Sequence, residues 1–273
     1  ALESPYPLEV QKRFYYGPRG NKNQLQTGSG RPRYCIIKKS SLLTGDMMER
    51  IMRAMEHALT VGCRPFLKSN SRSSGHPSFH VGHFLKPSSQ HDTPWVSRDT
   101  LQPSWNDSAS ATATHENRQD AMMSLALAID SVLNGRVQKA LKEIDPSSLK
   151  WSQRRVREEG KKGAINYSTS SIPPNAARSI KEDDISQLFR YGNLATCVAI
   201  GRGQSEKLHL DLHDDNKSYT IILNCGHPSD PWDRSENQGS LVLPTLGGSL
   251  PMNLGDVVFL EASTIPHRRK DWW

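Results

Sequence analysis

The 273-residue chain has few cysteines and no long hydrophobic run. Its four cysteines lie far apart with no Cys-x-x-Cys pair, which excludes zinc-finger spacing and a dense disulfide scaffold. We therefore expect a reducing, intracellular compartment. No apolar stretch approaches the roughly 20 residues of a membrane-spanning helix, and the opening segment lacks the basic-then-apolar pattern of a signal peptide. No membrane partner is expected.

Hydrophobic residues are also scarce, at 35% of the chain, so a core can form but cannot extend over the whole sequence. The net charge of +7 suggests a polyanionic partner. Because the sequence begins with Ala and stops at Trp273, a truncated protein is one interpretation. The oligomeric state is not predicted.

Changes in composition divide residues 1–273, interpreted as a single domain, into five segments. They are a basic N-terminal arm (1–40), a helix (41–65), a low-complexity insertion (66–120), a helical support region (121–190) and a strand-rich core (191–273).

The arm carries eight basic residues, including Lys38, against two glutamates, so its charge is 8 − 2 = +6. It is either a solvated segment or a contact for phosphates. Residues 33–39 have a β-branched, apolar centre that predicts a short strand. In 41–65, apolar residues three and four apart predict a helix, capped by Thr44 or Asp46 and ended by Gly62.

The insertion is rich in Ser, Thr, Asn, His and Gln, and we expect most of it to remain loop. Its histidines are either a metal-binding cluster or, as we favour, part of a solvated loop: His76, His80, His83 and His91. Some of its apolar side chains are expected to touch the body of the fold: Phe79, Val81, Phe84 and Trp95.

The support region predicts a long helix from Ala121 that Asn134-Gly135 bends or breaks and Asp145-Pro146 ends. Three arginines follow it, and two glutamates lie among them: Arg154, Arg155 and Arg157, with Glu158 and Glu159. This segment is either a charged helix surface, which we favour narrowly, or a phosphate-facing ridge or nuclear localisation signal.

From Leu194 onward, about seven short β-type runs alternate with glycine and proline turns, which indicates an α+β protein with a sandwich or barrel core. His209 and Asp211 lie in one of these runs. Residues two apart in a strand point to the same face, so both side chains can reach one ion, and His267 would return from a later strand. Two imidazoles and one carboxylate are the facial triad that holds non-haem Fe(II).

A simpler interpretation of His209 and Asp211 is a hydrogen-bonded pair on the surface of a β-sandwich. A second His-x-Asp follows as His213-Asp214-Asp215, and we interpret its carboxylates as turn-forming residues at a strand end.

The ordered motifs of this region resemble a known family. They are His209-Leu-Asp211-Leu-His-Asp214, Tyr219-Thr-Ile-Ile-Leu, Gly239-Ser-Leu-Val-Leu-Pro244-Thr-Leu-Gly247, and Gly255-Asp256 followed by an apolar strand and His267. The run from Tyr191 to His267 is similar to the core of 2-oxoglutarate/Fe(II)-dependent dioxygenases. More narrowly, it resembles the fungal branch related to TET-like 5-methylcytosine oxygenases and base-J thymidine hydroxylases.

The resemblance implies a double-stranded β-helix (jelly-roll or cupin-like) core. It also implies Fe(II) held by His209, Asp211 and His267, and 2-oxoglutarate as co-substrate, with Tyr219 and Arg269 as candidate contacts. The activity would be oxidation of a methylated base, first of all 5-methylcytosine, flipped out of nucleic acid, with DNA favoured over RNA and a nuclear location. Arg154, Arg155 and Arg157 would contact the phosphates.

One departure concerns the co-substrate. The family places an Arg or Lys about ten residues after the distal His, where it pairs with the far carboxylate. This chain ends six residues after His267, and Arg269 follows it by only two. A truncated chain, altered co-substrate binding or an inactive protein would each account for this. The alternatives are a catalytically inactive nucleic-acid-binding protein, and a dioxygenase of proteins or small molecules.

Overall fold

The computed structural model describes residues 36–63, 78–84, 95–97, 99, 112–169, 190–201, 207–211, 214–215, 217–226 and 240–270. Most of the expected arm, much of the expected insertion, and His213 lie outside these residues. Within them, helices occur together with antiparallel sheets, so the α+β expectation is confirmed. None of the helices in these ranges is long and apolar enough to cross a membrane.

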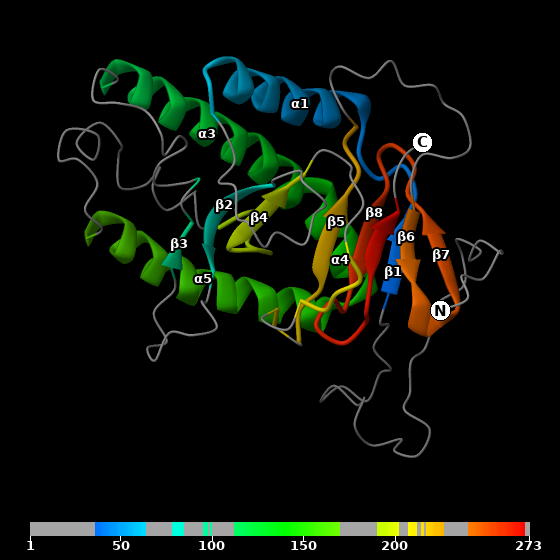
Figure 1. Ribbon diagram of the computed structural model, residues 1–273. Helices are drawn as coiled ribbons and strands as arrows, with labels where there is room; N and C mark the ends of the chain where they lie inside the picture. The colour runs from blue at the N-terminus through cyan, green and yellow to red at the C-terminus, as the bar shows by residue number, and fades with distance from the viewer. Residues whose placement is uncertain are drawn as a thin grey trace.

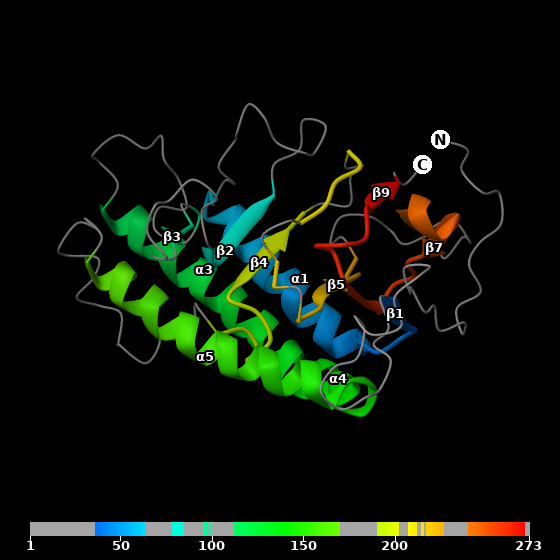
Figure 2. The same cartoon turned by 90° about the horizontal axis from the view of Figure 1, so that it is seen from below.

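The helices lie together on one side of the strands (Figures 1 and 2). They are α1 (Gly45–Thr60), α3 (Thr112–Val132), a π-helical turn (Leu133–Val137), α4 (Gln138–Ile144) and α5 (Pro146–Thr169). The helix expected in 41–65 is α1, with Thr44 at its N-cap and Gly62 at a φ of 88° just beyond its end. The expected helix from Ala121 begins earlier, at Thr112, and Asn134-Gly135 lies in the π-helical turn that carries it into α4.

Asp145 separates α4 from α5, as its position before a proline predicts. One carboxylate oxygen, Oδ1, accepts hydrogen bonds from the backbone N–H groups of Ser147 (3.1 Å) and Ser148 (2.9 Å). Pro146 occupies the first position of α5, where no backbone donor is needed. The Asp-Pro pair therefore both stops one helix and starts the next.

The strands form three small antiparallel sheets, ordered β1-β8-β5, β3-β2-β4 and β7-β6-β9. The strands are β1 (Ile36–Lys39), β2 (Phe79–Phe84), β3 (Trp95–Val96), β4 (Cys197–Ile200), β5 (Thr220–Leu223), β6 (Ser240–Leu243), β7 (Gly248–Pro251), β8 (Val257–Leu260) and β9 (Arg268–Lys270). They confirm the density of short strands expected after Leu194, and β1 confirms the strand expected in 33–39.

The β1-β8-β5 sheet is the middle layer. All four residues of β8 are fully buried, and they alternate between two cores. Val257 and Phe259 pack with the helices, whereas Val258 and Leu260 pack with residues of the β7-β6-β9 sheet. Each large apolar side chain buried in this way contributes about 1.5–3 kcal/mol, so β8 fixes both neighbouring layers.

Lys38 corrects the sequence interpretation of the basic arm. It lies in β1, and its ammonium forms a buried ion pair with Asp256, with Nζ and Oδ2 2.6 Å apart. Asp256 also accepts hydrogen bonds from the backbone N–H groups of Ser41 (2.9 Å) and Asn253 (2.7 Å). A buried charge needs such partners, and removing one typically costs about 3–5 kcal/mol. Lys38 is thus part of the fold and not of a phosphate-contacting surface.

The expected insertion contributes two strands, β2 and β3, to the body of the protein. β2 pairs with β4, and Phe79 and Val81 are buried, which confirms the expected contact with the fold. His83, expected in a solvated loop, is also buried in β2, and this part of the prediction is wrong. His76 and His91 lie outside the described residues. The alternation of Phe79, Val81 and His83 toward the core is the period-2 pattern of a strand.

Candidate metal centre

The backbone brings His209 and His267 directly opposite each other. They form an antiparallel bridge in which each N–H donates to the other's carbonyl oxygen, both at 3.0 Å. The N–H of Asp211 donates to the carbonyl oxygen of Ala262 at 2.9 Å. Residues 207–211 therefore run beside 262–267, and the two histidines are neighbours although 58 positions separate them in the sequence.

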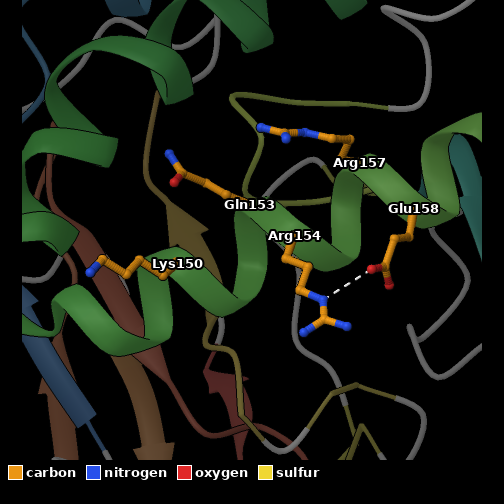
Figure 3. A pocket seen from close by; sticks show the side chains of 5 residues that line it. All are labelled: Lys150, Gln153, Arg154, Arg157 and Glu158. Carbon is orange, nitrogen blue, oxygen red and sulfur yellow. Dashed lines mark hydrogen bonds and ion pairs between the residues drawn. The ribbon is translucent and has the colours of Figure 1, made fainter.

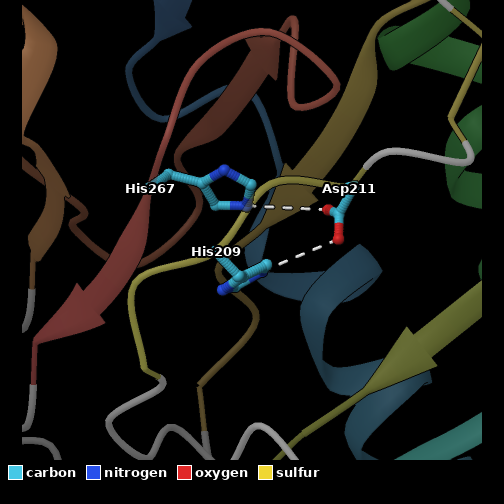
Figure 4. Close-up of side chains that lie close together, drawn as sticks. All are labelled: His209, Asp211 and His267. Carbon is cyan, nitrogen blue, oxygen red and sulfur yellow. Dashed lines mark ion pairs between the residues drawn. The ribbon is translucent and has the colours of Figure 1, made fainter.

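The three side chains converge on one point (Figure 4). Nε2 of His209 lies 3.7 Å from Oδ1 of Asp211, and Nε2 of His267 lies 3.6 Å from Oδ2. One ligand atom from each residue lies within 4.8 Å of the others, and the two imidazole centroids are 4.4 Å apart. The structure thus brings together the residues that the sequence selected.

Each histidine is oriented by its own backbone. Nδ1 of His209 is 2.8 Å from the carbonyl oxygen of Lys207, and Nδ1 of His267 is 2.9 Å from that of Ile265. A carbonyl oxygen can only accept, so both Nδ1 atoms carry the proton. In a neutral ring this leaves the lone pair on Nε2, the atom that faces Asp211. Such an Nδ1–H bond to a carbonyl is the usual support of a metal-binding imidazole.

The resulting electrostatics favour a cation. Two Nε2 lone pairs face carboxylate oxygens at distances too long for hydrogen bonds, so acceptors face acceptors unless a proton or a cation lies between them. Metal bonds from nitrogen and oxygen are about 2.0–2.2 Å long, which places adjacent ligand atoms about 3 Å apart. The observed separations need only a small inward movement of the side chains. The donor set therefore fits a divalent transition metal.

The site is partly open. The His267 side chain is 6% exposed and that of His209 13%, whereas Asp211 retains 25%. Three ligands leave further positions for water or substrate on a metal that prefers six. Among the residues that the structure describes, this is the one group of His, Cys, Asp and Glu side chains that meets such spacing.

Tyr219, a predicted co-substrate contact, lies toward the helices. Its side chain is buried, its hydroxyl is 3.5 Å from Oδ2 of Asp145, and its ring packs edge-on against Phe259 at 6.2 Å. Phe259 belongs to the core shared with the helices. Arg269, the other predicted contact, pairs through its backbone with Leu241, and its side chain lies outside the described residues. Both roles stay predictions.

The three arginines of α5 have different surroundings. Arg154 and Arg157 are exposed, and Nε of Arg154 is 3.0 Å from Oε1 of Glu158. Arg155 is tied inward: its guanidinium is 3.5 Å from Glu159, 3.6 Å from Asp215 and 3.7 Å from Glu158. Contact with phosphates stays a prediction for all three, and the ion pairs of Arg155 favour a structural role.

The sequence did not reveal that α5 holds the segment after Asp211 through contacts to Asp215, Lys217 and Ser218. The indole N–H of Trp151 donates to Oδ2 of Asp215 at 2.8 Å. Two serines of α5 add further hydrogen bonds. Oγ of Ser148 donates to the carbonyl oxygen of Lys217 at 2.9 Å, and the hydroxyl groups of Ser152 and Ser218 are hydrogen-bonded to each other at 2.9 Å. The sequence signal that could have indicated this contact is the presence of small polar residues, Ser148 and Ser152, on one face of a charged helix.

Asp215 also shapes the turn, as interpreted from the sequence. Its Oδ1 accepts the backbone N–H of Lys217 at 2.8 Å, and its carbonyl oxygen accepts that of Ser218 at 3.0 Å. The N–H of Asp214 donates to the carbonyl oxygen of Asp211 at 2.9 Å. The Asp215 carboxylate therefore serves this turn, as expected, whereas the Asp214 carboxylate accepts a hydrogen bond from the Thr220 hydroxyl of β5.

Comparison with known proteins does not place the chain in a family. No protein-family model matches it, and no curated protein matches it significantly. The functional argument consequently depends on the site and its surroundings.

Proposed function

We propose that the protein is an Fe(II)- and 2-oxoglutarate-dependent dioxygenase that oxidises a methylated base in nucleic acid, with 5-methylcytosine in DNA as the first candidate. The convergence of His209, Asp211 and His267, with both Nε2 atoms directed at the carboxylate, carries the proposal. Two histidines and one carboxylate with open positions are typical of non-haem Fe(II) oxygenases.

The arrangement of strands supports a double-stranded β-helix core. The β1-β8-β5 and β7-β6-β9 sheets share an apolar core between them, formed by Val258 and Leu260 on one side and Leu241, Leu243 and Leu250 on the other. His267 directly precedes β9, and Asp211 is joined to Ala262 just after β8. The proposed ligands thus lie at the ends of strands from both sheets, a position that suits a site at the mouth of a barrel.

The chain's own groups would hold and orient the reactants. His209, Asp211 and His267 would bind the metal, and the carbonyl oxygens of Lys207 and Ile265 would keep both imidazoles in the required tautomer. When bound, Fe(II) would supply the chemistry that couples decarboxylation of 2-oxoglutarate to oxidation of a C–H bond by dioxygen. The overall reaction converts 2-oxoglutarate, dioxygen and a methyl group to succinate, carbon dioxide and a hydroxymethyl group.

The test is reconstitution of the full chain with Fe(II) under anaerobic conditions, followed by 2-oxoglutarate, air and a duplex containing 5-methylcytosine. We expect bound Fe(II) in a 1:1 ratio by calorimetry, and equal amounts of succinate and hydroxymethylated base by mass spectrometry. H267A should lose both signals.

The outcomes separate the alternatives. Fe(II) binding with succinate formed only in the presence of a protein or small molecule would replace the nucleic-acid substrate. Salt-sensitive DNA binding without Fe(II) binding would replace the enzyme with an inactive binding protein. A wild-type protein that binds neither Fe(II) nor DNA would overturn the proposal as a whole.

A further inference from the structure

The exposed face of α5 forms a shallow basic hollow (Figure 3). Its volume is about 300 Å³, and five residues line it: Lys150, Gln153, Arg154, Arg157 and Glu158. The cations lie at positions i, i+4 and i+7, so they form one stripe along the helix. The buried residues of α5 lie on its other side, among them Leu149, Ser152 and Val156.

The charge of this surface is not balanced by its neighbours. Three cations face one carboxylate, and Glu158 already pairs with Arg154 and Arg155. Among the described residues, no ion pair is formed by Lys150 or Arg157, and the structure exposes both. An excess of fixed positive charge on an open surface attracts a polyanion.

Lys217 adds a cation beside the stripe. Its Nζ lies 4.2 Å from the centre of the Trp151 ring, so a cation–π contact holds the ammonium against α5 without neutralising it. Lys217 belongs to the segment clamped by Trp151, Ser148 and Ser152. The basic surface therefore continues from the helix onto the chain that leads from the triad.

One edge of the surface, at Trp151 and Lys217, is close to the candidate metal centre. Asp215, which the Trp151 indole contacts, is four residues from Asp211, and four residues span at most about 14 Å. The turn closed between Asp214 and Asp211 shortens this distance further. One strand of duplex DNA carries a phosphate about every 3.4 Å along the axis. A base at the triad and phosphates on α5 can thus belong to the same few nucleotides.

We propose that Lys150, Arg154, Arg157 and Lys217 bind the phosphate backbone of nucleic acid, independently of its sequence. This inference deepens the proposed function, because it names the surface on which the nucleic-acid substrate lies. Arg155 is not part of the surface, since its three carboxylate partners draw it inward. Gln153 offers a neutral donor in the middle of the stripe.

The test measures binding of a fluorescent, unmethylated duplex by the full chain across a salt series, without metal or 2-oxoglutarate. Each phosphate neutralised contributes about 0.9 to the slope of log K against log salt. We expect the double variant K150Q/R157Q to lower that slope by about 1.8. The control variant R50Q/R53Q removes the same charge from α1, where Arg53 is 76% exposed, and should leave the slope within about 0.5 of wild type.

Three results would overturn the inference: no binding of duplex by the wild type at low salt, an equal loss in both double variants, or preferential binding of an acidic polypeptide such as polyglutamate. The last would make the surface a protein-docking site. The duplex is unmethylated and bound without metal or 2-oxoglutarate, so failure of the metal chemistry and failure of this surface are distinguishable.

Discussion

Asp211 and Asp215 are carboxylates four residues apart, and their surroundings differ in kind. Asp215 accepts hydrogen bonds from the Trp151 indole and the Lys217 backbone, and it lies 3.6 Å from the Arg155 guanidinium. Asp211 faces Nε2 of His209 and Nε2 of His267. Donors and a positive charge surround one carboxylate, whereas two imidazole Nε2 atoms face the other.

This difference separates a structural carboxylate from a functional one. Asp215 stabilises the fold because its charge is satisfied by groups that the chain supplies. Asp211 instead faces two imidazole Nε2 atoms, so a bound cation between the three side chains would complete its surroundings. Residues that serve a function often lower stability in the absence of their ligand, and the acceptor cluster around Asp211 fits that pattern.

The largest expected effect is on metal binding. D211N replaces a charged ligand by a neutral amide and should weaken Fe(II) binding at least about 100-fold. That is the upper end of the loss in metal affinity caused by mutating residues that only hydrogen-bond to the ligands. D215N should change Fe(II) affinity by less than about tenfold, because Asp215 lies four residues from Asp211 and its carboxylate contacts Trp151 and not the proposed ligands. Anaerobic calorimetry measures both. Equal losses in the two variants would show that Asp211 is no more a ligand than Asp215.

The sequence predicted the residues of the candidate metal centre, including Asp211, well. His209, Asp211 and His267 could be selected because a period-2 strand places residues i and i+2 on one face, and because a glycine turn before β8 returns the chain. Helix α1 and the short strands also follow from local periodicity. Residues 207–211 form only a single bridge and not a named strand, but the bridge is enough to align the two histidines.

The surroundings of Asp215 could not be predicted, because they depend on tertiary contacts that leave no local pattern in the sequence. Trp151 and Asp215 are 64 residues apart, and nothing in either segment names the other. Lys38 looks like part of a basic arm until β1 places it against Asp256. His83 belongs to a polar stretch, yet it lies in β2, pairs with Val96 of β3 and is buried, as are Phe79 and Val81. In each case, packing overrides composition.

The second expected effect is stabilisation by metal. A ligand at 100 times its dissociation constant adds about 2.7 kcal/mol to the free energy of unfolding, which for a chain of this size raises Tm by roughly 5–10 °C. Wild type and D215N should both show this increase with Fe(II) or Mn(II), and D211N should not. Thermal unfolding followed by circular dichroism measures it. A shift retained in D211N would place the metal elsewhere in the chain.

The smallest expected effect is on stability without metal, and here the order of the two variants reverses. With a chelator present at pH 8, D215N should lower the free energy of unfolding by about 1–3 kcal/mol. The reason is that the Trp151 indole and the Arg155 guanidinium lose a charged acceptor. D211N should leave stability unchanged or raise it, since its amide can donate to an imidazole Nε2 that faces it. Urea unfolding gives both values.

The variant W151F provides the matched control, because it removes the indole donor while Asp215 stays charged. It should destabilise by about 1 kcal/mol, less than D215N, and should leave Fe(II) affinity near that of wild type. If D211N were instead the more destabilising of the two carboxylate variants in the chelator, the imidazoles would be protonated and paired with Asp211 at pH 8. The cluster would then be an ion pair that stabilises the fold, and the argument for a metal from the facing Nε2 and carboxylate oxygen atoms would fail.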